Sequence, residues 1–133
     1  MPNQPASIDS ERGFPLDPEP LFHALSDEIR RRILCLIVDQ GELCVRELFY
    51  ALDLPQPKVS RHLAVLRDSG VLALRREATR VFYRLHPGLP LWAHRVLTAM
   101  SEGVTLQGAQ KCDVQRLVSM PNRPRRGALI AVA

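Results

Sequence analysis

Hydrophobic residues recur at helical spacing in several parts of this chain. Ile29, Ile33 and Ile37 lie four positions apart, after the favourable N-cap residue Ser26 and before the helix-ending Gly41. That pattern predicts a helix between Ser26 and Gly41. Apolar spacing and boundary residues of the same kind predict further helices at residues 21–25, 44–52, 56–69 and 91–102.

A different pattern separates the last two of these helices. Val81, Tyr83 and Leu85 alternate with their neighbours at the period of a half-buried strand. Residues 71–76 and 80–85 are therefore predicted to be two strands, joined by a hairpin loop at residues 77–79. The order α-α-α-α-β-β-α predicts a mainly α fold with a β-hairpin wing, the winged helix-turn-helix.

The predicted domain occupies the middle of the chain, at residues 20–102. Five of the eleven prolines fall within the first 20 residues, so residues 1–19 are expected to form a flexible N-terminal arm. Residues 103–133 are expected to be a C-terminal extension, in which residues 113–118 add one or two helical turns.

Charge is distributed unevenly along the chain. The formal net charge is +4, but residues 1–55 carry a net −5 and residues 56–86 a net +5. A basic block in the middle of a domain favours a polyanionic partner. A solvated face beside an unrelated basic tail would give the same numbers, so charge alone leaves both interpretations open.

The helix at residues 56–69 has two distinct faces. On a helical wheel Val59, Leu63 and Leu66 fall together, whereas Lys58, Arg61 and His62 fall on another side. A recognition helix in the DNA major groove needs this division, although an ordinary amphipathic surface helix shares it. The residues predicted to contact double-stranded operator DNA are Gln56, Lys58, Ser60, Arg61 and His62 on the helix, and Arg75, Arg76 and Arg80 at the tip of the wing.

Four short runs together resemble the ArsR/SmtB, or arsenic-repressor, family of winged helix-turn-helix regulators. They are Leu25–Arg30, Gly41–Val45, Gln56–Leu63 and Tyr83–Leu85, and the similarity extends over about residues 20–102. The resemblance implies a homodimeric repressor that binds operator DNA without a cofactor and leaves it when a metal, metalloid or other effector binds.

The resemblance also implies where two subunits meet, through the first and last helices of the domain. Leu21, Phe22 and Leu25 would contact Trp92, Val96 and Met100, although the same residues could instead belong to the core of one chain. The wing departs from the family, whose members often carry glycine in the hairpin loop. Here the loop is Glu77-Ala78-Thr79, so a turn that needs a positive φ would be strained.

The three cysteines are the candidate ligands for an effector. No apolar run approaches the roughly 18 residues of a membrane span, and residues 1–20 do not resemble a signal peptide, so a cytoplasmic protein with reduced thiols and no membrane partner is expected. Arsenic-sensing relatives carry Glu-Leu-Cys-Val-Cys-Asp-Leu-Cys before the recognition helix. Here only Cys44 of that motif is present, because Arg46 and Phe49 replace the other two thiols.

Three interpretations of the thiols remain open at this point. Cys44 and Cys112, from one subunit or two and with or without Cys35, would bind trivalent arsenic or antimony, As(III) or Sb(III). Alternatively, two cysteines form a redox or persulfide switch, or all three are structural and the repressor has no metalloid response. Cys35 lies off the stripe of Ile29, Ile33 and Ile37, so it need not belong to the core. The helix dipole beside Cys44, with Arg46 nearby, is expected to favour the thiolate form of Cys44.

Other classes of protein fit the sequence poorly. There is no nucleophile elbow, phosphate loop or pair of acids in an apolar setting, so an enzyme is not expected. The last helix offers only His94, with His86 just before it, as ligands for zinc, and surface positions suit both. A protein-interaction module without DNA is the remaining alternative, and the exposed cations of the 56–69 helix argue against it.

Overall fold

The computed structural model describes residues 16–106 and 108–124, so most of the predicted N-terminal arm and the last nine residues lie outside the described part. The elements follow the order α2 (Pro18–Leu25), α3 (Glu28–Gln40), β1 (Glu42–Cys44), α4 (Val45–Leu52), α5 (Gln56–Asp68), β2 (Leu72–Glu77), β3 (Arg80–Leu85), α6 (Leu91–Leu106) and α7 (Ala109–Val118). The predicted helices and hairpin are confirmed, except that α2 begins at Pro18, within the predicted arm, and that Cys44 belongs to the short strand β1 and not to a helix. Helix α7 is longer than the one or two turns predicted there.

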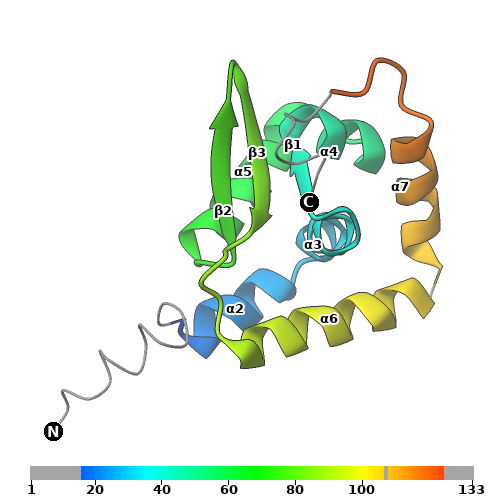
Figure 1. The fold of residues 1–133 in the computed structure, drawn as a ribbon. Helices are drawn as coiled ribbons and strands as arrows, with labels where there is room; N and C mark the ends of the chain where they lie inside the picture. Colours follow the sequence, from blue (N-terminus) through cyan, green and yellow to red (C-terminus); the bar gives the residue numbers. More distant parts are fainter. Residues whose placement is uncertain (1–15, 107, 125–133) are drawn as a thin grey trace, which may run out of the picture.

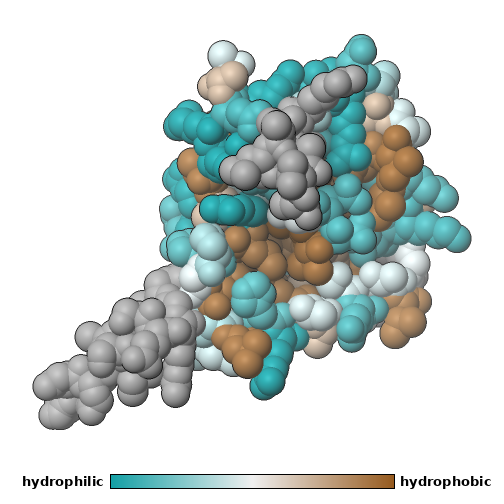
Figure 2. All heavy atoms as spheres, viewed as in Figure 1, coloured by the Kyte–Doolittle hydropathy of each residue, from teal (hydrophilic) through white to brown (hydrophobic). Residues whose placement is uncertain are grey.

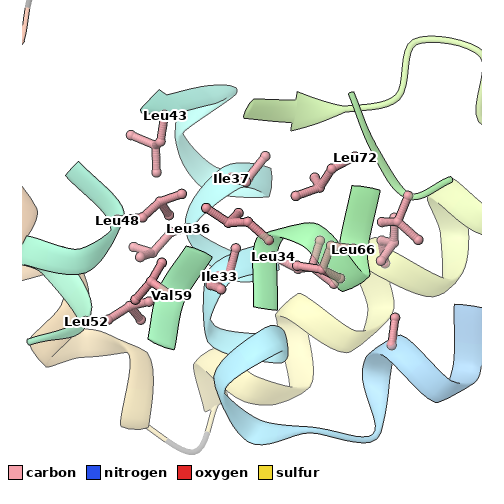
Figure 3. Close-up of a cluster of buried hydrophobic side chains, with 14 of the residues drawn as sticks. Ile33, Leu34, Leu36, Ile37, Leu43, Leu48, Leu52, Val59, Leu66 and Leu72 are labelled. Atoms are coloured by element: carbon pink, nitrogen blue, oxygen red, sulfur yellow. The ribbon is translucent and has the colours of Figure 1, made fainter. Parts of the chain in front are cut away.

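Helix α3 lies in the middle of the molecule, and the other elements surround it (Figure 1). Asp27, one residue after the predicted cap Ser26, starts this helix by accepting a hydrogen bond from the backbone N–H of Arg30 at 3.1 Å. Ile33, Leu36 and Ile37 of α3 meet apolar side chains from α4, α5 and β2 (Figure 3). This single core fixes α5 and the wing relative to each other.

The wing is a three-stranded antiparallel sheet in the order β1-β3-β2. Leu43 of β1 and Leu74 of β2 both pair with Tyr83 of the central strand β3. The sequence pattern predicted only β2 and β3, because three residues are too few to display an alternation. Strand β1 matters for the site because it joins the wing to the start of α4.

The turn of the wing carries the strain that the sequence predicted. Glu77 pairs with Arg80, and Ala78 between them has a φ of 55°, in the left-handed region that an alanine rarely adopts.

We therefore expect Ala78→Gly to raise the free energy of unfolding by about 1 kcal/mol, since glycine reaches this φ without a steric penalty. Urea unfolding followed by circular dichroism measures the change. The matched control is Ala64→Gly on the exposed side of α5, which should lower stability by about 1 kcal/mol because glycine weakens a helix interior. A loss of stability in Ala78→Gly would contradict the assignment of strain to this turn.

Helix α7 packs against α3, α4 and α6. Asp113, with 1% of its side chain exposed, accepts hydrogen bonds from Arg32 of α3 at 2.7 and 2.9 Å and from Arg116 at 2.9 Å. The same two arginines donate to the last carbonyls of α4, Arg32 to Leu52 at 3.0 Å and Arg116 to Ala51 at 2.7 Å. These bonds hold α7 against α3 and α4, the helices that support α5. The predicted domain boundary at residue 102 falls inside α6, which ends at Leu106.

Candidate nucleic-acid interface and thiol sites

Helix α5 presents one buried and one exposed face, as its sequence predicted. Val59, Leu63 and Leu66 are fully buried against the core. Gln56, Lys58 and Arg61 are exposed, and Ser60 is half-buried. Pro55 in an extended conformation precedes the helix and Pro57 occupies its first turn, where a missing N–H costs no hydrogen bond. The exposed face combines two cations with an amide, the side-chain types that contact phosphates and base edges.

His62 does not belong to that exposed face. Its Nδ1 lies 3.3 Å from a guanidinium nitrogen of Arg30 and 3.7 Å from Oδ2 of Asp27, and 18% of its side chain is exposed. Burial lowers the pKa of His62, which favours the neutral imidazole. The side chain joins α5 to the beginning of α3, and contact between His62 and DNA stays a prediction.

Arg30 extends this junction to a third helix. Its Nε donates to the carbonyl of Ala24 at 2.9 Å, and a terminal nitrogen donates to the carbonyl of His23 at 3.0 Å. Both carbonyls lie in the last turn of α2, and that of His23 also accepts hydrogen bonds from the C-cap residue Ser26. Arg30 and His62 therefore hold the orientation of α5 relative to α2.

The wing arginines fall into two groups. Arg75 lies within β2, opposite Phe82, and not at the tip of the hairpin, so its predicted position is wrong. Its guanidinium forms ion pairs with Glu42 and Glu77, each at 2.7 Å, and lies 4.8 Å from the centre of the Phe82 ring. Those contacts hold Arg75 to the sheet, because its donors serve two carboxylates of the same chain.

Arg76 and Arg80 are exposed, and neither forms an ion pair with the described residues. Figure 2 shows mostly hydrophilic side chains around the wing, whereas apolar ones gather closer to α6. Arg80 is the first residue of β3 and therefore lies at the turn. These two arginines remain available for a polyanion.

Arg46 is a candidate that sequence reasoning missed. It is exposed in the first turn of α4, and it lines one groove together with Gln56 at the start of α5 and Arg80 at the wing tip. The available signal was a basic residue at the start of the helix that precedes the recognition helix.

The structure separates the three cysteines. Cys35 is fully buried in α3, and its Sγ lies 3.7 Å from Sδ of Met100 on α6. Burial raises the pKa of the Cys35 thiol. Its position off the isoleucine stripe therefore does not place it outside the core. Cys112 is exposed on α7.

Cys44 caps the N-terminus of α4. Its backbone N–H donates to Glu47 at 2.9 Å, and its side chain accepts from the backbone of the same residue, so the pair forms a capping box. Only 4% of Cys44 is exposed, and burial raises the pKa of its thiol. The expectation that the helix dipole favours the thiolate is wrong, because desolvation outweighs it.

Cys44 and Cys112 lie at opposite ends of α4 within one chain. Cys44 precedes the helix, whereas Asp113 and Arg116 of α7 are bound near its last residues, Ala51 and Leu52. Eight residues of helix separate the two ends, a length of about 12 Å. Accordingly, within residues 16–106 and 108–124 no three His, Cys, Asp or Glu side chains form a metal-binding group. The three cysteines therefore do not form a site in one chain as it stands.

The geometry agrees with the similarity to known proteins. The model of the arsR family of bacterial regulatory proteins matches residues 27–73, which extend from the start of α3 into β2. The arsenic resistance transcriptional regulator ArsR1 of Pseudomonas putida is 46% identical over 112 residues, covering 83% of this chain and 84% of that relative. The chain belongs to the ArsR family of bacterial regulatory proteins.

Solved structures of similar proteins have the same winged helix-turn-helix fold as this ArsR-family chain. Reduced HlyU from Vibrio cholerae is 33% identical with a TM-score of 0.56, over 81% of this chain and all of that one. The AntR antimony-specific transcriptional repressor is 26% identical with a TM-score of 0.54, over 68% of this chain and 78% of that one.

Among the described residues, no helix is long and apolar enough to span a membrane.

The residues predicted to form a dimer interface divide between the core and the surface. Leu21 is fully buried within one chain, so it is not available to a second subunit and that part of the prediction is corrected. Phe22 is 53% exposed on α2 and Trp92 is 37% exposed on α6. The remaining three residues, Leu25, Val96 and Met100, are half-buried beside the core.

Proposed function

We propose that this ArsR-family protein is a transcriptional repressor that binds operator DNA as a homodimer and leaves it when a trivalent arsenic or antimony species binds its thiols. The main support for DNA binding is the exposed face of α5. Gln56, Lys58 and Arg61 extend outward from a helix whose opposite side is locked into the core. Such a helix fits the major groove, and the exposed Arg76 and Arg80 of the wing would contact the flanking backbone.

A homodimer is supported by the apolar surface of α2 and α6. Phe22, Leu91 and Trp92 are large apolar side chains that one chain leaves exposed, and a small soluble protein rarely exposes such groups together. A two-fold interface would cover them on both subunits. A palindromic operator requires that this interface place two copies of α5 on one side of the assembly.

The effector half of the proposal rests on thiol chemistry and on relatives. The relatives include arsenic resistance regulators and an antimony-specific repressor by name. Trivalent arsenic and antimony seek soft thiolate ligands, and Cys44 lies at the start of α4, the helix directly before α5. Because one chain holds Cys44 and Cys112 apart, we propose that Cys112 reaches Cys44 from the second subunit or after leaving its place on α7.

Arg61→Ala tests the proposed reading of DNA. Exposed Arg61 is expected to bind a base edge, so its loss should weaken binding by about 1–3 kcal/mol on a duplex that the wild-type protein selects from a random pool. Binding to a scrambled duplex should change far less. Fluorescence anisotropy at a fixed salt concentration measures both affinities. Equal losses on the two duplexes would make Arg61 a phosphate contact, and a wild-type protein that selects no duplex would refute the proposed function.

A further inference from the structure

A groove lies between the wing and the two helices of the helix-turn-helix. It has a volume of about 380 Å³, and its polar lining comes from Arg46 on α4, Gln56 on α5, and Thr79 and Arg80 at the wing turn. Cys44 belongs to its wall. No carboxylate is among the described residues that line it.

The acidic residues close to this groove are already engaged by other arginines. Glu42 and Glu77 form ion pairs with Arg75, and Glu47 with Arg123. Arg46 and Arg80, in contrast, form no ion pair with any described residue. Two cations from different elements therefore border one hollow without a counter-charge in the described part of the chain, and their mutual repulsion costs free energy unless an anion is present.

The backbone adds to this positive potential. Helix α4 begins at Val45 on the edge of the groove, so the positive end of its dipole and the N–H groups that precede the one capped by Cys44 lie beside Arg46. The amide of Gln56 and the hydroxyl of Thr79 supply neutral hydrogen-bond donors. Guanidinium groups, helix N–H groups and neutral donors around a small hollow are the partners that a phosphate group takes.

From this arrangement we infer that the groove binds one phosphate of the DNA backbone, with Arg46 and Arg80 as its charged ligands. The inference rests on the proposed function, because the phosphate belongs to the duplex that α5 reads. Gln56 is the first residue of α5, so a phosphate held here would fix the depth and register of that helix in the major groove. Arg46 thus becomes a DNA-binding residue outside the recognition helix and the wing.

The test is a scan of single neutral phosphates along the duplex that the wild-type protein selects from a random pool. Methylphosphonate replaces one phosphate at a time, and anisotropy measures the affinity of each duplex. Wild-type protein should bind roughly tenfold more weakly when the contacted phosphate is neutral. A loss of this size is expected when charge-assisted hydrogen bonds to one phosphate are removed. Arg46→Ala should lose less than about twofold at that same position while keeping its other sensitivities, and its salt slope should fall by about one.

Arg95→Ala is the matched control, because it removes one exposed cation from α6, outside the groove. It should keep the wild-type sensitivity at every position. If Arg46→Ala shows the same sensitivity profile and salt slope as the wild type, the groove does not bind a phosphate, although the proposed repressor function stands. If the wild type selects no duplex at all, both proposals fail.

Discussion

Replacing Asp113 with alanine is expected to lower the free energy of unfolding by about 3 kcal/mol, although Asp113 lies far from the DNA-reading face. The carboxylate is almost completely buried, and it neutralises both Arg32 and Arg116. Its removal leaves two guanidinium groups in a partly buried place with no counter-charge, which is costly in measured cases. Helix α7 would then lose its ion pair with Arg32 of α3, whose guanidinium also binds the last turn of α4.

Urea unfolding of the full chain, followed by circular dichroism, measures this effect. The matched control is Asp39→Ala, which removes an exposed carboxylate from α3 and should change stability by less than about 0.5 kcal/mol. A second measurement is hydrogen exchange, which should show faster exchange in residues 109–118 of Asp113→Ala. A loss below about 1 kcal/mol with unchanged exchange would mean that α7 is held by its apolar contacts alone.

The parts of the fold that sequence predicted are those in which local pattern and packing agree. Val59, Leu63 and Leu66 are spaced at a helical period, and each of them is fully buried. In β3 the alternation marks Val81, Tyr83 and Leu85, which are half-buried, whereas Phe82 on the opposite face is fully buried. Local periodicity was sufficient in α5 because the core uses the same face that the pattern marks.

The parts that sequence missed depend on contacts between distant residues. Helix α7 is stabilised by Asp113 binding Arg32, 81 positions away, and no local pattern reports such a pair. Arg75 was expected to bind DNA because charge in a sequence carries no sign of a partner, yet Glu42 lies 33 positions away and binds it. The contacts of His62 with Arg30 and Asp27 were missed for the same reason, since both residues face it from the beginning of α3.

These long-range contacts indicate how the binding of an effector to the thiols would change the affinity for DNA. Helix α4 lies between the two candidate ligands, with Cys44 before its first residue and α7 attached to its last turn. Helix α4 also packs against α5, so a displacement of either end of α4 changes the orientation of the recognition helix. A ligand that binds the displaced form more tightly would thereby weaken DNA binding by the same coupling free energy.

Cys44→Ser and Cys112→Ser are each expected to abolish release from DNA at effector concentrations that release the wild type. Each change removes one of two proposed thiolate ligands, so the concentration for half-release should rise by a factor on the order of 100 or more. Binding by Cys44 requires exposing a buried thiol and opening its capping box, so we expect only a strongly thiophilic species such as trivalent arsenic or antimony to be bound there. Anisotropy of the protein–duplex complex, titrated with arsenite, antimonite and methylated arsenicals, measures release.

Cys35→Ala is the matched control, because that thiol is buried against Met100 and lies apart from α4 and its capping box. It should release DNA within about twofold of the wild-type effector concentration, a difference of less than about 0.5 kcal/mol in binding.

Mixed dimers that combine one Cys44→Ser subunit with one Cys112→Ser subunit distinguish a site shared between subunits from a site within one subunit. If the thiols come from different subunits, one complete site remains and release is retained at half the wild-type stoichiometry; if both thiols come from one subunit, no complete site remains and release is lost. Normal release by both single variants would refute the assigned ligands, and a wild-type protein that binds DNA but ignores every thiophilic species would refute the effector class.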